Sequence, residues 1–150
     1  MRLRPVTWDD ADILLAWRNA PVVRAASRST DEVTTAEHQA WLTRMLESPC
    51  SWLFLGVDED DQPVGHTRIS EEGGYGEVSI VVAPRARDRG LGAQLLTLTH
   101  DAYAAGGGSC KLRAFVRSSN DASHRLFLSV GYVVDEQTDM GTWYEWSGRD

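Results

Sequence analysis

A turn rich in arginine and glycine is the segment of this sequence best suited to bind an anion. It reads Arg87-Asp88-Arg89-Gly90-Leu91-Gly92 and lies between a strand expected over residues 77–82 and a helix expected over residues 91–105. The first turn of a helix has unpaired N–H groups and the positive end of the helix dipole, and glycine lets the backbone approach an anion closely. The arginines add charge that suits phosphate. The segment is therefore predicted to hold a diphosphate group.

The turn differs from two common nucleotide-binding loops. It does not end in Gly-Lys-Ser or Gly-Lys-Thr, and its glycines lack the spacing of the dinucleotide fingerprint. A second run follows it downstream, Asn120-Asp121-Ala122-Ser123-His124-Arg125-Leu126-Phe127, with Gly131-Tyr132 after it. The two segments resemble the GNAT acetyltransferase signatures, which are Gln/Arg-x-x-Gly-x-Gly/Ala and Asn-x-x-Ala/Ser-x-x-Leu-Tyr followed by Gly-Phe.

The resemblance implies a coenzyme A site. The backbone amides of the turn would bind the pyrophosphate, the strand before it would pair with the pantetheine arm, and the asparagine of the second motif would contact the pantetheine or help to fix the neighbouring strand. The cofactor-binding residues implied in this way are Ile80, Val81, Val82, Arg87, Asp88, Arg89, Gly90, Leu91, Gly92, Ala93, Asn120, Ser123 and Phe127. Acetyl-CoA is the expected co-substrate. No metal is expected, because the cysteines lack metal-ligand spacing.

Acetyl transfer to an amine needs a base, because an alkylamine with a pKa of about 10.4 is mostly protonated at neutral pH. Glu77 is the candidate base, since some members of the family place a glutamate at this offset from the turn. Its alternative role is that of a solvated carboxylate at a strand start. Phe115 stands where other members carry a base on the fifth strand, which favours Glu77 or a water relay. The backbone N–H of Val82 is implied as the oxyanion donor.

The general acid is the point at which this sequence departs from the family. The usual tyrosine of the second motif is replaced by Phe127, which cannot donate a proton. Tyr132 is the candidate in its place, with Ser123 and Tyr144 as alternatives. A thiol with a pKa of about 8.5 is also a fair leaving group without assistance.

The acceptor site is expected in the N-terminal half. Trp-Arg-Asn at residues 17–19, Val-Arg at residues 23–24 and Glu-His-x-x-Trp at residues 37–41 resemble the pseudaminic-acid-pathway acetyltransferases, which act on an amino sugar carried on UDP. Arginines can hold a diphosphate, and tryptophan can stack on a sugar or base. The candidate substrate-binding residues are Trp17, Arg18, Arg24, His38 and Trp41. Tryptophans at helical spacing are alternatively part of a core, and ribosomal-protein N-terminal acetyltransferases share parts of the pattern.

Hydrophobic periodicity and turn residues predict the elements that position these groups. Capping boxes at Thr7 and Thr34 begin two helices, Gly106 follows a third, and Gly131 follows a fourth. Strands are expected over residues 3–6, 52–57, 64–69, 77–82, 111–116, 132–134 and 142–146. The fold class is therefore α/β (α+β): a single-domain GNAT fold over residues 1–150, with a mixed, mostly antiparallel sheet of about seven strands and four helices packed on both faces.

Composition limits the partners. The net charge of −7 argues against a general nucleic-acid binder, and no apolar run approaches the roughly 20 residues of a membrane helix. We expect a cytoplasmic protein that is a monomer or homodimer, with a small-molecule amine as its acceptor and neither nucleic acid nor membrane as a partner.

Three functions remain open on the sequence. The leading one is an N-acetyltransferase acting by direct attack in a ternary complex on a primary amine, with an amino sugar, free or nucleotide-linked, as the preferred acceptor. The second is acetylation of a protein or peptide α-amine. The third is a non-catalytic acyl-CoA-binding module, because the usual general acid is absent.

Overall fold

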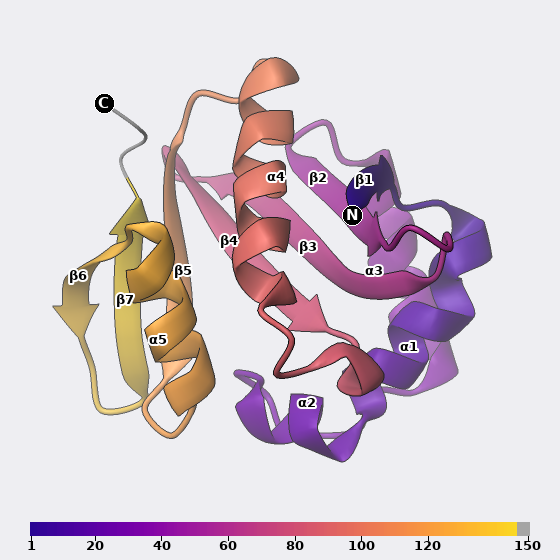
Figure 1. Ribbon diagram of the computed structural model, residues 1–150, viewed down its shortest axis with the longest axis horizontal. Coiled ribbons are helices and arrows are strands. Elements are labelled where there is room, and N and C mark those ends of the chain that lie inside the picture. Colours follow the sequence, from indigo (N-terminus) through magenta and orange to yellow (C-terminus); the bar gives the residue numbers. More distant parts are fainter. Residues whose placement is uncertain (147–150) are drawn as a thin grey trace.

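Seven strands form one mixed sheet in the spatial order β1-β2-β3-β4-β5-β7-β6 (Figure 1). The computed structural model describes residues 1–146. β4 pairs with β5 in parallel, and the other neighbouring strands are antiparallel. The strands are β1 (Arg2–Pro5), β2 (Ser51–Val57), β3 (Pro63–Glu72), β4 (Tyr75–Val82), β5 (Lys111–Arg117), β6 (Val133–Gln137) and β7 (Gly141–Trp146). The helices are α1 (Ala11–Asn19), α2 (Pro21–Ala26), α3 (Thr35–Glu47), α4 (Leu91–Ala105) and α5 (Asp121–Val130), with 3-10 turns at Trp8–Asp10 and Pro84–Ala86.

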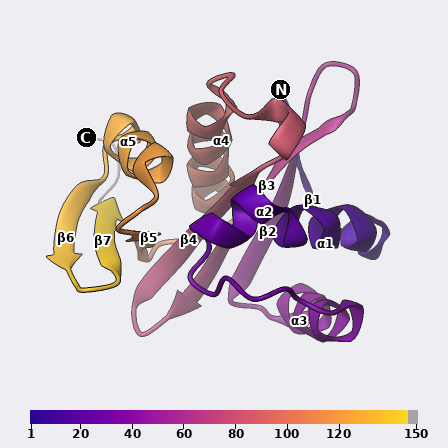
Figure 2. The same cartoon turned by 90° about the horizontal axis from the view of Figure 1, so that it is seen from below.

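Helices cover both faces of this sheet (Figure 2). α4 and α5 pack against each other on one face, where α4 also contacts β3 and β4, whereas α1, α2 and α3 lie on the other face. The predicted fold class is confirmed, but the expected count of four helices misses α2. Within residues 1–146, no helix is long and apolar enough to span a bilayer.

α2 shows why a short helix escapes detection. Pro21 stands at its first position, where a missing N–H and a fixed φ suit a helix start. The sequence analysis used Pro21 as a sign that the preceding helix stops near Asn19, and α1 does end there. With six residues, α2 is too short to display a hydrophobic period of its own.

Polar caps fix the ends of the longer helices. The Thr34 hydroxyl accepts a hydrogen bond from the Glu37 amide at 3.1 Å, and the Glu37 carboxylate accepts one from the Thr34 amide at 3.3 Å. The Asn120 side chain accepts from the Ser123 amide at 3.2 Å at the start of α5, and Gly131 ends that helix with a φ of 113°. These caps replace hydrogen bonds that the helix ends cannot make internally.

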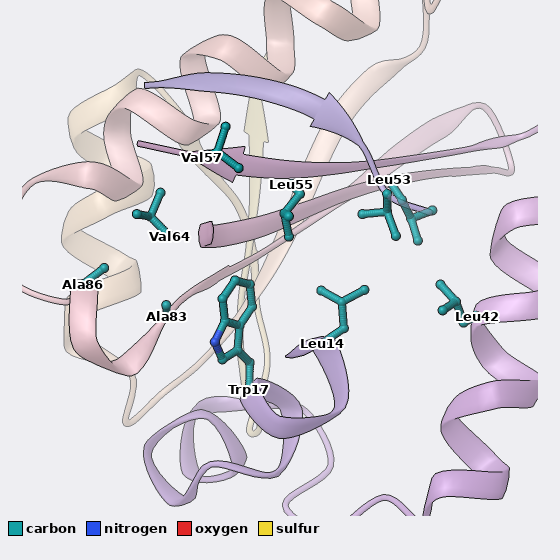
Figure 3. Close-up of a cluster of buried hydrophobic side chains, with 10 residues drawn as sticks. Leu14, Trp17, Leu42, Leu53, Leu55, Val57, Val64, Ala83 and Ala86 are labelled. Atoms are coloured by element: carbon teal, nitrogen blue, oxygen red, sulfur yellow. The ribbon is translucent and has the colours of Figure 1, made fainter. Parts of the chain in front are cut away.

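Two apolar cores lie on opposite faces of the sheet. On the α1–α3 face, Leu14 and Trp17 of α1 and Leu42 of α3 meet the sheet (Figure 3). The Leu42 side chain is completely buried, and burial of such a side chain stabilises the fold by about 1.5–3 kcal/mol. The second core contains Ile69, Val78, Leu96, Tyr103, Leu112, Ala114, Val116, Phe127, Tyr132 and Tyr144. Between them, the cores hold β4 and β5 in place at the centre of the molecule.

Candidate active site

β4 and β5 separate partway along their length. Their parallel pairing covers three positions, from Tyr75 opposite Lys111 to Glu77 opposite Arg113. On its other edge, β4 stays paired with β3 as far as Val82 opposite Gly65. Residues 78–82 of β4 therefore have no strand partner on the β5 side within the described part of the chain. This open edge, which contains Ile80, Val81 and Val82, can pair with an extended ligand, because strand backbone groups are obligatory hydrogen-bonding groups.

The arginine and glycine turn joins this open edge to the start of α4. Gly90 caps the helix in the left-handed conformation, with a φ of 72°, and a Cβ at this position would have no heavy atom within 4 Å. Asp88 also has a positive φ, of 62°. Arg87 is half-buried, Asp88 and Arg89 are exposed, and Leu91, Gly92 and Ala93 form the first turn of α4. The free space in front of a 15-residue helix fits a diphosphate bound by backbone amides.

Gly92 has a packing role as well. A Cβ on Gly92 would lie 3.0 Å from a methyl carbon of Leu126 on α5, closer than most real contacts. The glycine therefore allows α4 and α5 to approach each other. Replacing it would disturb both this packing and the turn, so a loss of coenzyme A binding in such a variant would not identify a diphosphate site.

The second motif contributes mainly to structure. Asn120 is the N-cap of α5, and Ser123 is half-buried in the first turn of that helix. Phe127 is 3 % exposed and packs edge-on against Tyr132, with ring centroids 4.9 Å apart. The expectation that the Phe127 side chain contacts the cofactor is therefore wrong for this structure, because the ring belongs to the core beneath α5.

Glu77 lies where β4 and β5 begin to separate. Its carboxylate is 36 % exposed and forms an ion pair of 2.7 Å with Arg28, in the segment after α2. The Arg28 guanidinium lies over the rings of Phe115 and Trp143, with its Cζ 4.8 Å and 5.3 Å from their centroids. An ion pair this exposed contributes about 0–1 kcal/mol, so Arg28 can move aside at little cost. Glu77 therefore remains the candidate base.

Tyr132 is not placed to act as a general acid. Its side chain is 2 % exposed, and its hydroxyl group forms a 2.8 Å hydrogen bond with the His100 ring on α4. Burial raises the pKa of Tyr132. Its neighbours include the core residue Phe127 and the half-buried Trp146. The prediction for Tyr132 is corrected, because a hydroxyl sealed beneath α4 and α5 cannot reach a thiolate at the open edge of β4.

Tyr144, an alternative general acid, also has its hydroxyl group in contact with another side chain of the fold. Its hydroxyl lies 2.6 Å from His124 Nδ1, whose other ring nitrogen lies 2.9 Å from the Arg117 carbonyl oxygen. Burial raises the pKa of Tyr144. This chain of contacts fastens α5 to β7 and β5.

Four of the five predicted acceptor residues are engaged within the fold. Trp17 is 8 % exposed and belongs to the core, so the prediction that it stacks on a ligand is wrong. The Arg18 and Arg24 side chains donate to the carbonyl oxygens of Ser29 and Thr30 at 3.0 Å and 3.1 Å. These two arginines hold the segment after α2.

His38 is the fourth of these residues and is 5 % exposed. Burial, followed by the charge of Arg18, lowers its pKa, so the ring is neutral at pH 7. Trp41 remains half-buried beside it, with ring centroids 5.4 Å apart. Arg18, Arg24 and Trp41 are each half-buried and keep a partly open surface, and their roles in acceptor binding stay predictions.

A cationic and aromatic surface around Glu77 was not foreseen. The Arg68 guanidinium donates to the Ser79 hydroxyl at 2.9 Å and lies over Trp41, with its Cζ 5.9 Å from the ring centroid. The Arg113 guanidinium lies 4.0 Å from the Trp143 centroid. Arg68 of β3, Glu77 of β4 and Arg113 of β5 project from the same face of the sheet. Because side chains alternate between the two faces along each strand, the sequence pattern of the three strands could have indicated this surface.

His66 lies on β3 opposite Val81 of β4, within this same face. Its Nδ1 lies 3.2 Å from the Phe54 carbonyl oxygen, and a neutral ring can donate this hydrogen bond. Burial lowers the pKa of His66 to about 4. Within residues 1–146, no group of three histidine, cysteine, aspartate or glutamate side chains is arranged to hold a metal ion.

Solved structures that resemble this one include acetyltransferases with coenzyme A bound. Spermidine N-acetyltransferase from Vibrio cholerae, in complex with coenzyme A and spermine, superimposes with a TM-score of 0.83 at 14% identity, covering 95% of this chain and 91% of the other. The aminoglycoside acetyltransferase AAC(6')-Ib, in complex with coenzyme A, gives 0.80 at 18% identity over 96% and 92%. A domain from Methanocaldococcus jannaschii gives 0.82 at 20% identity over 95% of each chain. At these identities, the likeness establishes the fold.

Sequence comparison goes further than the fold. No curated protein matches the chain. The model of the Acetyltransferase (GNAT) family, however, matches residues 14–132, which contain the open edge of β4, the turn before α4 and α5. The open strand edge and the glycine turn both lie within the matched residues, and their role as the coenzyme A site stays a prediction. The chain belongs to the GNAT acetyltransferase family.

Proposed function

We propose that this protein transfers the acetyl group of acetyl-CoA directly to the primary amine of a small acceptor, an amino sugar in free or nucleotide-linked form. Use of acetyl-CoA follows from membership of the family. The observation that supports direct transfer is the position of Glu77, on the same strand as the open edge and three residues before Ile80. A base in this place reaches an amine that approaches the thioester from the α1–α3 face.

The roles of the chain's own groups follow from this placement. The acceptor first releases the extra proton of its ammonium form to solvent, and Glu77 then accepts a proton from the neutral amine, directly or through water, as the amine nitrogen bonds to the acetyl carbon. The Val82 N–H is proposed to donate to the developing oxyanion. The carbon–sulfur bond breaks with its electron pair on sulfur, and the thiolate takes its proton from solvent. Since thiol pKa values are about 8.5, this departure does not require Tyr132.

The acceptor side of the proposal rests on the surface around Glu77. Trp41 and Trp143 are half-buried, and the guanidinium groups that lie over them, Arg68 over Trp41 and Arg28 and Arg113 over Trp143, offer hydrogen-bond donors. Aromatic faces with nearby polar donors suit a sugar ring that carries hydroxyl or phosphate groups. An amine on a flexible peptide would make less use of these fixed rings, so an amino sugar is preferred to a peptide α-amine.

Glu77→Gln tests the catalytic role. We expect the variant to release thiol from acetyl-CoA about 10²–10⁴-fold more slowly in the presence of glucosamine or a UDP-linked amino sugar, because the base is lost. Glu59→Gln, in the exposed turn after β2, is the matched control and is expected to keep normal turnover. Thermal stabilisation by acetyl-CoA should be retained in both variants.

Three other outcomes would overturn parts of the proposal. Normal turnover of Glu77→Gln across neutral pH would remove Glu77 as the base. Acetylation of a peptide N-terminus, together with no transfer to sugars, would favour the peptide acceptor. Stabilisation by acetyl-CoA with no thiol release for any amine would identify a non-catalytic binding module.

A further inference from the structure

We infer that the acceptor carries an anionic group, a carboxylate or a phosphate, close to its amine, and that Arg28, Arg68 and Arg117 bind this group beside Glu77. This inference rests on the proposed acetyl transfer and specifies the chemical class of its acceptor. It also moves the anion-binding function away from Arg18 and Arg24, which hold the segment after α2.

The three arginines belong to one surface. Arg28 contacts Glu77 of β4 and lies over Phe115 of β5. Arg117 lies two residues after Phe115 on the same face of β5 and donates to the carbonyl oxygen of Ser27 at 3.0 Å. Arg68 reaches Ser79 from β3, two residues beyond Glu77 on β4. The guanidinium groups therefore surround the point where β4 and β5 separate.

The positive charge of this surface exceeds the negative charge that faces it. Glu77 compensates Arg28, and Asp135 lies 3.7 Å from Arg113. Arg68 and Arg117 have no carboxylate within ion-pair distance in the described part of the chain, and each is bonded to a neutral oxygen. Two guanidinium groups without an ion-pair partner in residues 1–146, on a protein with a net charge of −7, indicate a local site for an anion.

Burial adds to this imbalance. Arg68 is half-buried, and burial is the largest effect that lowers its pKa; the charge of Glu77 opposes this shift, and the charge of Arg28 adds to it. A bound anion would act in the same direction as Glu77, whereas a cationic acceptor would act in the same direction as Arg28. The site therefore favours an acceptor that brings its own negative charge.

The geometry of Arg28 is suited to this role. Its guanidinium is supported by two aromatic rings, yet 57% of its side chain remains exposed. A guanidinium supported in this way presents a planar set of donors that matches a carboxylate or a phosphate. An incoming anion would also compete with Glu77 for Arg28, which would free the Glu77 carboxylate for the amine.

The distance between anion and amine is limited by the sheet. Arg68 and Glu77 project from adjacent strands, which are about 4.8 Å apart, and Ser79 lies next to Glu77 on their common face. An acceptor that reaches both groups at once therefore has its amine and its anion separated by a few bonds. Polyamines, which carry a second cation at this distance, are expected to be poor acceptors.

Matched pairs of acceptors test the inference. The pairs are glucosamine with glucosamine 6-phosphate, ethanolamine with O-phosphoethanolamine, and 1,4-diaminobutane with 4-aminobutanoate. We expect kcat/KM for thiol release to be at least about tenfold higher for the anionic member, an advantage that falls as salt is raised. The first two pairs test phosphate and the third tests carboxylate, so the series also separates these two anions.

Arginine variants test the residues. Arg28→Gln and Arg68→Gln should raise KM for the anionic acceptor by about tenfold or more and should raise KM for its neutral partner by a clearly smaller factor. Arg68→Lys should recover part of the loss, and Arg44→Gln, on the exposed side of α3, should behave as the unmodified protein. Because Arg28 is exposed, Arg28→Gln is expected to fold even where Arg68→Gln does not.

The outcomes separate the inference from the proposed function. Transfer that is equal for both members of each pair, or that favours the cationic one, would overturn the inference and leave acetyl transfer standing. An absence of thiol release with every amine would overturn the proposed function instead. In that case, calorimetric binding of glucosamine 6-phosphate and glucosamine to the coenzyme A complex decides the question of the anion, and equal affinities would exclude the site.

Discussion

The ionisation of His66, on the α1–α3 face of the sheet, is expected to limit the pH range in which the folded protein is stable. His66 contacts Phe54 by a hydrogen bond and lies near Trp41, and the charges that act on it are those of Arg68, His38 and Asp10. Its pKa of about 4 in the folded protein lies below the ordinary value of 6.5. Between these two pH values, the unfolded chain binds a proton at this position that the folded chain does not.

Stability is therefore expected to fall as the pH is lowered from 6.5 to 4. The loss attributable to His66 is up to about 3 kcal/mol in the free energy of unfolding. Urea denaturation at pH 7 and pH 5 measures it, and His66→Gln should reduce the difference between the two pH values. Part of the stability difference between pH 7 and pH 5 should remain in this variant, because burial also lowers the pKa of His38. An unchanged pH dependence in the variant would show that His66 is protonated in the folded state.

Residue contacts across the sheet explain what the sequence did not reveal about the site. Glu77 and the turn after it could be proposed as site residues because they share one continuous segment. Arg28 is 49 positions away from Glu77, and nothing in its local sequence indicates that it forms an ion pair with that residue. Trp17 was misassigned for a related reason, since a tryptophan on a helix face has the same sequence pattern whether it faces a ligand or the core.

At the scale of elements, prediction was accurate wherever caps and turns left a local signal. α4 begins and ends at the expected residues, Leu91 and Ala105, because glycines flank it on both sides. β3 and β4 extend beyond their expected ends, because residues 70–72 and 75–76 pair across a tight turn. Long-range pairing of this kind depends on the partner strand, which a local pattern cannot show.

The start of α4 yields a prediction about the cofactor. Gly90→Ala should weaken coenzyme A binding by about tenfold or more, because the added methyl group occupies the space in front of the helix. It should also destabilise the fold by about 1–2 kcal/mol, since alanine is strained at this positive φ. Calorimetry and urea denaturation measure the two effects.

Gly73→Ala is the matched control for this change. Gly73 has a φ of 60° and equally open surroundings, but it lies in the turn between β3 and β4. It should lose similar stability and keep full coenzyme A affinity. Equal affinity losses in the two variants would mean that strain alone, and not the position of Gly90, governs binding.

At the scale of the whole molecule, the separation of β4 from β5 divides the sheet into two parts. β1–β4 form one part and β5–β7 the other. They are joined by three pairs of residues, by the second apolar core with its packing of α4 on α5, and by the bond from Arg117 to Ser27, among other contacts. A ligand that pairs with the open edge of β4 fills the gap between the parts. Binding should therefore affect both parts together.

Coenzyme A is expected to stabilise the protein as a unit. At a concentration about 100 times its Kd, it should raise the free energy of unfolding by about 2.7 kcal/mol, because it binds the folded state alone. Amide hydrogen exchange should slow at residues 78–82, which lack a strand partner on the β5 side, and at the first turn of α4. The Gly90→Ala variant should require a higher concentration of coenzyme A for the same slowing of amide hydrogen exchange. Stabilisation without added protection at residues 78–82 would place the ligand elsewhere and would remove the open edge of β4 as the pantetheine site.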